Sequence, residues 1–171
     1  MGQQFDNALW REAMGGFPTG VTVVTSHAED GSPAGTAVNA FCSLSISPPL
    51  LLVCLGRSSR TLETLRRAGS FCVNVLSDRQ GDIVERFARK DETGRFDGVP
   101  FTLGVSGDPL LSDTVAWFDC RVHEILDGGD HEIVIGEVAA LSADSAAAPL
   151  AYHRGRVQPF SSRGAEEGAA P

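Results

Sequence analysis

Residues 39–49 read NAFCSLSISPP, and this stretch decides how the first half of the chain folds. It begins like a β-strand, alternates small hydroxyl side chains with apolar ones, and ends at two prolines. A strand that only packs a core carries bulkier residues on its packed face, whereas Ser43, Ser45 and Ser47 share one face here. Proline lacks a backbone N–H and restricts the residue before it, so the strand should end at Pro48. Two interpretations stay open: an edge strand whose serines and prolines prevent aggregation, or one wall of a polar ligand site.

The segment that follows supplies groups for the second interpretation. The apolar run LLLVCL (50–55) predicts a strand buried on both faces, and GRSSR (56–60) leads from it into the helical pattern TLETLRRAG (61–69). Backbone N–H groups at a helix start, hydroxyls and guanidinium groups together bind anions. The simpler alternative is an N-cap with solvated arginines. Because the link between the two segments is short, we expect the serine strand to return beside LLLVCL, with Ser43 and Ser45 near Ser58 and Ser59.

The rest of the pattern predicts a mainly β (α+β) protein. Apolar residues at helical spacing predict a short amphipathic helix from Phe5 to Met14, and Asp78 is a candidate cap for a second helix through DIVERFAR (82–89). Six or seven strands with two or three helices indicate an antiparallel barrel with flanking helices. Strands are expected at 21–26, from 34 onward, 50–55, 71–76, 115–126 and 131–142, a loop at 90–99, a last ordered piece at 149–160 and a disordered tail at 161–171.

Composition limits the possible classes of function. The chain has 171 residues, 42% hydrophobic and 21% charged, which is typical of one globular domain, and its net charge of −8 argues against general nucleic-acid binding. It has no apolar run of about 18 residues, and the start of the sequence lacks the pattern of a secretory signal, so we expect a cytoplasmic protein with no membrane segment. The four cysteines form no CxxC or Cys/His cluster and are expected to be structural, with no metal. No GxGxxG follows a strand, so a Rossmann site is not supported.

His131 directly follows the predicted hairpin turn, in GGDHEIVIG (128–136). A histidine at such a place is usually an exposed turn residue. It has a function only if this end of its strand faces a ligand pocket.

Several segments, taken together and in order, match one known family. They are FPTGVTVVTS (17–26), GTAVNAFCSLSISPPLLLVCLGRSSRTLETL (35–65), FCVNVLS (71–77), ERFA (85–88), GRFDG (94–98), GDHEIVIGEV (129–138) and PLAYHRGR (149–156). In these segments the chain resembles the flavin reductase-like, FMN-binding split-barrel proteins, which include the small reductase components of two-component flavin monooxygenases. The resemblance extends from about Phe5 to Gln158.

The resemblance implies a homodimer of antiparallel split β-barrels, one domain at residues 1–160 in each chain. It implies FMN or FAD near the dimer interface, NADH or NADPH as hydride donor, and a partner flavin-dependent monooxygenase that receives reduced flavin. His131 matches a histidine placed near the nicotinamide, and Tyr152 and Arg154 match a motif on the pyridine-nucleotide side. The flavin-binding residues carried over are Thr36, Ala37, Val38, Asn39 and Ala40 for the ring, Ser43, Ser45, Arg57, Ser58, Ser59 and Thr61 for the ribityl chain and phosphate, Phe87, Ala88 and Arg89 to complete the pocket, and Cys54, Leu55 and Gly56 as further cofactor contacts.

Two departures from the family pattern are present. Ser47 stands where many relatives have aspartate before the paired prolines, and His153 replaces a common aromatic residue. The choices between FMN and FAD and between NADH and NADPH stay open, with Arg57, Arg60 and Arg89 as candidate contacts for a 2′-phosphate. Two other functions also stay open: a flavoprotein that holds its flavin tightly and acts on another acceptor, and a non-enzymatic flavin-binding module on the same fold.

Overall fold

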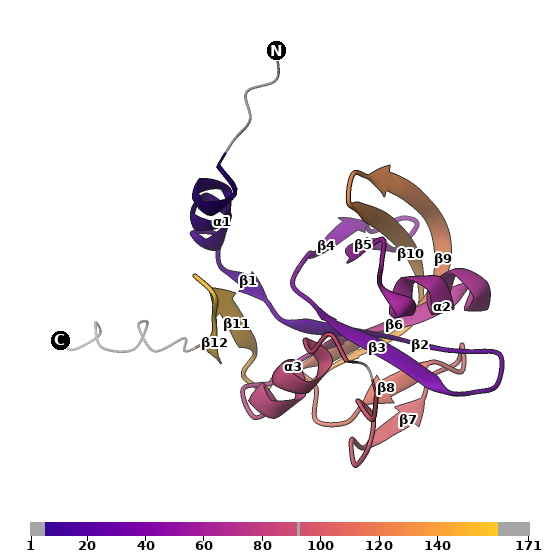
Figure 1. Cartoon of the computed structure of the whole chain (residues 1–171). Helices are drawn as coiled ribbons and strands as arrows, with labels where there is room; N and C mark the ends of the chain where they lie inside the picture. Colours follow the sequence, from indigo (N-terminus) through magenta and orange to yellow (C-terminus); the bar gives the residue numbers. More distant parts are fainter. Residues whose placement is uncertain (1–5, 92, 161–171) are drawn as a thin grey trace.

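A seven-stranded antiparallel sheet organises the protein, in the spatial order β3-β2-β6-β9-β10-β5-β4 (Figure 1). The structure is a computed structural model that describes residues 6–91 and 93–160. The strands of this sheet are β2 (Thr22–His27), β3 (Pro33–Val38), β4 (Phe41–Ser45), β5 (Leu50–Gly56), β6 (Ser70–Val75), β9 (Ala116–Gly128) and β10 (His131–Ala143). The other elements are α1 (Asn7–Gly15), β1 (Thr19–Gly20), α2 (Arg60–Ala68), α3 (Gly81–Phe87), β7 (Phe101–Leu103), β8 (Pro109–Leu111), β11 (Leu150–His153) and β12 (Arg156–Pro159).

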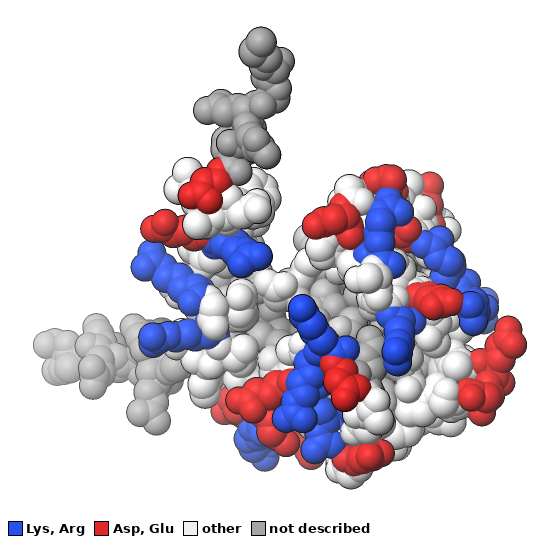
Figure 2. Space-filling model, in the orientation of Figure 1, with Lys and Arg blue, Asp and Glu red and all other residues white. Residues whose placement is uncertain are grey.

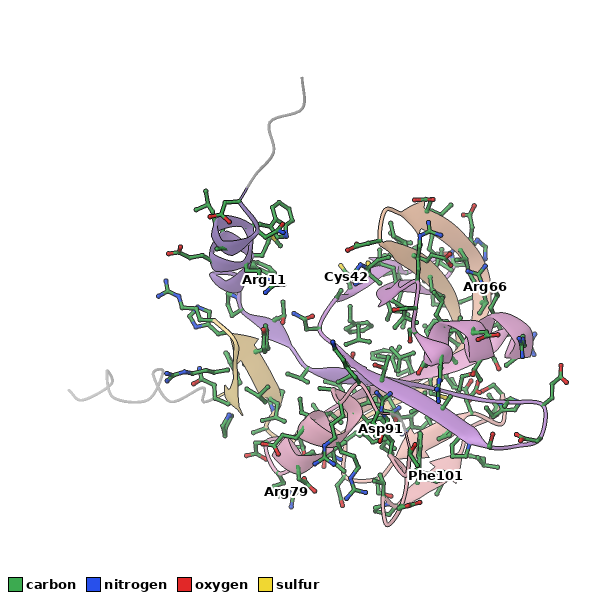
Figure 3. All side chains as sticks on the ribbon, viewed as in Figure 1. Arg11, Cys42, Arg66, Arg79, Asp91 and Phe101 are labelled. Atoms are coloured by element: carbon green, nitrogen blue, oxygen red, sulfur yellow. The ribbon has the colours of Figure 1, made fainter. Side chains whose placement is uncertain are left out.

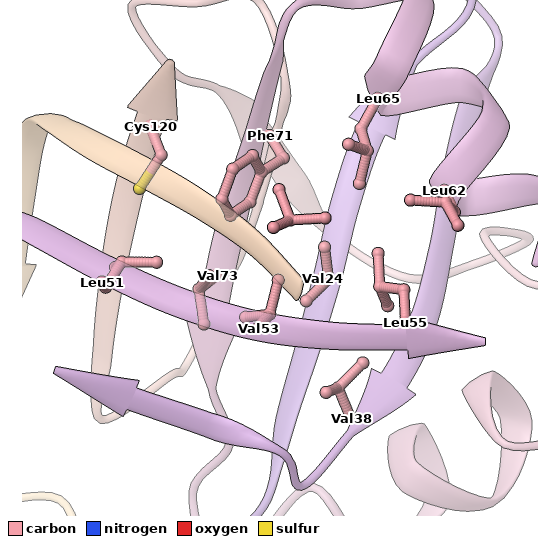
Figure 4. Close-up of a cluster of buried hydrophobic side chains, with 11 residues drawn as sticks. Val24, Val38, Leu51, Val53, Leu55, Leu62, Leu65, Phe71, Val73 and Cys120 are labelled. Atoms are coloured by element: carbon pink, nitrogen blue, oxygen red, sulfur yellow. The ribbon is translucent and has the colours of Figure 1, made fainter. Parts of the chain in front are cut away.

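The sheet curves around one apolar core. Alternate residues of β5, Leu51, Val53 and Leu55, are buried and pack with residues from β2, β3, β6, β9 and β10 and with two leucines of α2 (Figure 4). Side chains alternate between the faces of a strand, so six strands can meet in one cluster only if the sheet bends around it. The main-chain N–H of Cys54 donates to Ala40 O (3.0 Å), between the segment that follows β3 and the strand β5. The barrel-like, mainly β architecture expected from the sequence is therefore confirmed.

A second core lies on the opposite face of β2. Val23 points into it, whereas its neighbour Val24 points into the barrel, and α3 covers it with Ile83, Val84 and Phe87. Phe87 is fully buried and packs edge-on against Phe96, with 5.0 Å between the ring centroids. Ala37 of β3 packs against this outer core, which therefore supports the end of β3.

The ends of α2 follow the predicted capping pattern. Ser59 Oγ accepts a hydrogen bond from the N–H of Leu62 (3.4 Å), and Gly69 ends the helix at φ 71° in the left-handed region. A glycine adopts this conformation without the steric cost of a Cβ atom. The N-cap role of Ser59 is thus confirmed.

Some local expectations were wrong. Asp78 does not cap α3, because its own N–H is bonded to Ala148 O and the side chain of Gln80 turns this segment by accepting from the N–H of Ser77 (3.0 Å). β5 is buried on one face only, and its other face, with Leu52 and Cys54, is half-buried. The strand expected from residue 34 onward is divided into β3 and β4, and the short strands β1, β7, β8, β11 and β12 were not predicted individually, so the described residues hold twelve strands rather than six or seven.

The two ends of the chain are only partly described by the structure. The predicted disordered tail, residues 161–171, lies outside the described residues, as does Phe5. In α1, none of residues 7–15 is buried, so its apolar side chains are not packed within the chain as the structure describes it. Among the described helices, none combines the length and the apolar character needed to cross a bilayer.

Candidate functional site

A pocket of about 170 Å³ opens where the segment after β3 meets the end of β5 and the start of β10. All of its lining residues are among those carried over from the family resemblance: Thr36, Ala37, Val38, Asn39, Ala40, Cys54, Leu55, Gly56, Ser59 and His131. Ligand pockets commonly measure roughly 300–1,000 Å³. The pocket therefore encloses only part of a cofactor-sized ligand.

His131 is brought to this pocket by the pairing of β10 with β5, in which it stands opposite Gly56. The ring Nε2 would be 3.9 Å from a Cβ atom built on Gly56, so the histidine lies beside the end of β5. Its Nδ1 is 2.7 Å from Asp130 Oδ1. This hydrogen bond is the main reason that the pKa of Asp130 lies below its ordinary value. Since Nδ1 is engaged by the carboxylate, Nε2 is the ring atom available to a ligand.

The start of α2 forms one rim of the pocket. Ser59 lies in the lining, Ser58 is exposed, and Thr61 is fully buried. Among the described residues, Thr61 Oγ1 has no hydrogen-bond partner. A buried hydroxyl without a hydrogen-bond partner costs about 1–3 kcal/mol, and a polar ligand chain at this helix start would supply that partner. The unpartnered hydroxyl of Thr61 and the half-buried Gly56 in the lining fit the flavin that the family resemblance implies.

Arg57 points away from the pocket and toward the β9–β10 turn. Its Nε donates to Gly129 O (2.7 Å), and its Nη atoms reach Asp127 Oδ2 (2.6 Å) and Glu132 Oε1 (3.0 Å). In this conformation the guanidinium holds the turn rather than lining the pocket.

Two expected flavin ligands lie outside the pocket lining. Ser43 is exposed and Ser45 is half-buried on β4, which is an edge strand with a register shift between these two residues. β4 does lie at an edge of the sheet, which the first interpretation of NAFCSLSISPP expected. Phosphate binding by its serines stays a prediction.

The other expected site residues lie in different places in the fold. Phe87 belongs to the outer core and does not line the pocket, whereas Ala88 and Arg89 are exposed. Tyr152 pairs with Thr19, whose hydroxyl accepts from the side-chain amide of Asn39 (3.4 Å). The C-terminal motif is therefore linked to the pocket through β1.

Arg154 is exposed and has φ 49°. Its N–H donates to Gly15 O (2.9 Å), so its backbone joins the C-terminal motif to the end of α1.

Arg95 was not singled out from the sequence. It is only 6% exposed, and its guanidinium donates to Gly35 O (2.6 Å) and to Arg89 O. It therefore fixes β3 immediately before Thr36. Its segment, GRFDG, was part of the family resemblance, but nothing in the local pattern marks this arginine as buried.

The four cysteines differ in their surroundings. Burial raises the pKa of Cys120 to about 12 and that of Cys72 still further, which keeps both thiols neutral and structural. Cys42, on β4, is exposed (Figure 3), which the sequence did not predict, and Cys54 lines the pocket. Among residues 6–91 and 93–160, no group of three or more His, Cys, Asp or Glu side chains could hold a metal ion.

Charge is mixed over the surface. Figure 2 shows Lys and Arg interspersed with Asp and Glu on the face viewed, without a continuous basic area. A second pocket, of about 260 Å³, lies at the other end of β9 and β10, where its lining includes Asp113, Trp117 and Asp144. None of the residues expected from the sequence lies there.

Comparisons with known proteins point to one family. Residues 14–161 match the family described as flavin reductase like domain. A probable flavin reductase of Rhizobium meliloti is 48% identical over 88% of this chain, and the chain spans 48%, about half, of that relative's length. The reductase subunit HsaB of a flavin-dependent monooxygenase from Rhodococcus jostii is 38% identical, over 90% of this chain and 78% of its own length.

A solved structure agrees with these sequence matches. The NADH:FAD oxidoreductase SgcE6 of Streptomyces globisporus C-1027, in complex with NAD and FAD fragments, superposes with a TM-score of 0.87 at 35% identity. The match covers 95% of this chain and 99% of that one.

Proposed function

Because the chain belongs to the flavin reductase-like domain family, we propose that it is an NAD(P)H:flavin oxidoreductase. It reduces FMN or FAD with NADH or NADPH and supplies the reduced flavin to a partner flavin-dependent monooxygenase. The observation that carries the proposal is the pocket in which His131, Gly56 and residues 36–40 meet. Support for the partner comes from the relative that is a monooxygenase reductase subunit.

The residues of the pocket have distinct tasks in this proposal. When bound, the flavin supplies the ring that accepts a hydride from NAD(P)H. Thr36 to Ala40 and Cys54 to Gly56 form the surface along which that ring is held. His131 presents Nε2 beside the nicotinamide and orients it, with Asp130 fixing its ring. Holding the reacting atoms in position is the main catalytic contribution of the protein, and no side chain is required as a strong base.

Flavin in this proposal is an exchangeable substrate. Asn39, Ala40 and His131 are exposed, and Thr36, Cys54, Gly56 and Ser59 are half-buried. An open, partly exposed pocket favours binding and release over permanent retention. Ser43, Ser45, Ser58 and Thr61 are proposed as contacts for the ribityl chain and phosphate, and Tyr152 and Arg154 for the pyridine nucleotide.

A homodimer would complete the site. The apolar residues Leu9, Trp10 and Met14 of α1 are exposed, as are Leu44 and Ile46 on and after β4, and Ile46 is 95% exposed. Exposed apolar patches of this kind mark protein interfaces. In Figure 1, α1 stands clear of the sheet, which leaves its sides free to contact a second copy.

A direct assay tests the activity. The purified protein is mixed with NADH or NADPH and with FMN or FAD, and the absorbance of the reduced nicotinamide is followed. We expect oxidation that depends on added flavin. If no combination leads to oxidation, the proposal is wrong. A protein that keeps its flavin through dialysis and reduces another acceptor would instead be the tight-binding flavoprotein, and flavin binding without turnover would indicate a binding module.

A further inference from the structure

We propose that Arg57 is a positioning residue, which holds His131 in the pocket, and not a ligand of the flavin phosphate. The inference rests on the proposed function for its catalytic consequence. Its structural part, the immobilisation of the β9–β10 turn, can be tested without any assay of activity.

The contacts of Arg57 all lead to the turn that carries His131. Its main-chain N–H donates to Asp130 O (3.1 Å), and its Nε donates to Gly129 O (2.7 Å). Its two Nη atoms pair with the carboxylates of Asp127 (2.6 Å) and Glu132 (3.0 Å). One arginine thus binds four successive parts of the hairpin, from the last residues of β9 to the first residues of β10.

These contacts fix the chain on both sides of His131. The residue before it, Asp130, is held through its carbonyl by Arg57, and its carboxylate orients the imidazole ring. The residue after it, Glu132, has a side chain that is only 12% exposed and also accepts from Arg66 of α2. Figure 3 shows Arg66, a residue of α2, beside the β9–β10 hairpin. A hairpin turn at a surface is otherwise a mobile element. The contacts of Arg57 with Asp127, Gly129, Asp130 and Glu132, which we call the clamp, therefore determine what fraction of the time His131 lies in the pocket.

The charges argue against a phosphate at Arg57. Three of its five N–H donors are used by the turn. The carboxylates of Asp127 and Glu132 bond to it directly, and that of Asp130 lies nearby in the turn. A phosphate would have to displace these carboxylates or lie among them, and like charges at short range repel. Hydroxyl groups at the start of α2 carry no such penalty.

Steady-state kinetics with FMN and riboflavin separate the two roles, because riboflavin lacks the phosphate. We expect Arg57→Gln to lower kcat about tenfold with both flavins alike, since it removes the three side-chain contacts to Gly129, Asp127 and Glu132 and leaves only the main-chain bond to Asp130. Asp127→Asn should act in the same direction and more weakly. Arg57→Lys should restore little, because a single ammonium group cannot reach the carbonyl and both carboxylates at once. Arg67→Gln is the matched control, since the ion pair of Arg67 is with Glu63 within α2 and not with the turn.

A double-mutant cycle tests whether Arg57 acts through His131. In a His131→Ala background, Arg57→Gln should cause less than about a twofold further loss, because the residue that it positions is already absent. An Arg57→Gln variant that raises the KM for FMN tenfold or more, and leaves riboflavin unchanged, would show a phosphate ligand and overturn the proposal. Full additivity in the cycle would also overturn it.

Amide hydrogen exchange measures the mobility of the β9–β10 turn even if the protein does not reduce flavin. The clamp predicts that Arg57→Gln speeds exchange of the amides of residues 127–132 about tenfold or more, while exchange in β6 is unchanged. Unaltered exchange in the turn would exclude the clamp, whatever the result of the flavin assay. Failure of the wild-type flavin assay alone would overturn the proposed function and leave this structural result standing.

Discussion

His131 and Gly56 stand opposite each other where β10 pairs with β5, and the ring Nε2 lies 3.9 Å from the place of a Cβ atom on Gly56. This distance is an ordinary van der Waals contact, so a single methyl group fits there. A larger side chain would extend into the space between His131 and Ser59, both of which line the pocket. Residue 56 therefore controls how closely a planar ligand can approach the end of the strand.

Substitutions at residue 56 should affect binding by size. We expect Gly56→Ala to keep the flavin KM within about threefold and Gly56→Val to raise it at least about tenfold, which corresponds to about 1.4 kcal/mol of lost binding. Valine is favoured in strands, so the melting temperature should not fall. Kinetics with varied flavin and a thermal melt of each variant provide the check. Equal KM values for the two variants would show that the ring does not lie against Gly56.

His131→Ala should lower kcat about 10- to 100-fold at saturating flavin and NADH, which is at or below the low end of what a positioned acid–base side chain contributes. His123→Ala is the matched control, because His123 is exposed on β9 of the same hairpin and does not line the pocket. Unchanged flavin reduction in the His131 variant would remove this residue from the mechanism.

Gly35→Ala should disturb the pocket through the packing of β3 against Phe87 and Phe96. A Cβ atom on Gly35 would lie 2.8 Å from the Phe87 ring, which is shorter than Cβ atoms approach other atoms in proteins. It would also lie 3.1 Å from the Phe96 ring, which is a tight contact. The rings or β3 must shift, at a cost of about 1–3 kcal/mol in the free energy of unfolding. Because Thr36 follows directly, flavin affinity should fall as well. Denaturant unfolding and flavin titration measure the two effects, and an unaltered protein in both would contradict the close packing seen here.

Ile46→Lys should convert the proposed homodimer into a monomer, because it places a charge in the exposed apolar surface that we propose as the interface. Sedimentation velocity measures the mass directly. Leu103→Lys is the control, since Leu103 is also exposed but lies on β7, in the separate two-stranded sheet. A wild-type protein that is monomeric at concentrations used for catalysis would exclude the dimer. A dimer that withstands the Ile46 change would place the interface elsewhere.

Local signals made parts of the fold predictable. Ser59 and Gly69 mark the two ends of α2 by short-range capping chemistry, and Phe118, Cys120 and Val122, which alternate along β9, share the face that packs on the core. The residues lining the pocket followed from the family resemblance rather than from any single pattern. The position of His131 opposite Gly56 depends on the register of β10 on β5, which no local motif specifies.

Contacts between distant segments could not be predicted from local patterns. Arg57 looked like an anion ligand because Ser58 and Ser59 follow it, yet its carboxylate partners are 70 and 75 residues further along the chain. Asp78 had the composition of a cap, but its N–H donates to Ala148 O, and the side-chain amide of Gln80, at the start of α3, donates to Ser112 O. In each case a tertiary hydrogen bond engages a residue for which the local pattern indicated another role or none. The cytoplasmic location and the choice of flavin and nicotinamide stay predictions.

The carboxylate of Asp127 should give the hairpin a pH-dependent stability. Its pKa lies below the ordinary value of 3.8, first because its carboxylate accepts from the N–H of Gly129 and then because of Arg57. A carboxyl whose folded-state pKa is lowered stabilises the fold above its unfolded pKa, and this contribution is lost as the pH falls through the folded value. Asp127→Asn should therefore lower the melting temperature slightly at neutral pH, and the difference from wild type should shrink as the pH falls below 3.8 and the carboxylate becomes protonated in the folded state.

Thermal melts of both proteins across this range measure the effect. Glu124→Gln, at an exposed carboxylate on the same strand, is the control for loss of one negative charge. A difference between Asp127→Asn and wild type that persists unchanged in acid would mean that the ionised carboxylate does not hold the turn. In that case the other contacts of Arg57, to Gly129 O, Asp130 O and Glu132, would hold the turn without Asp127.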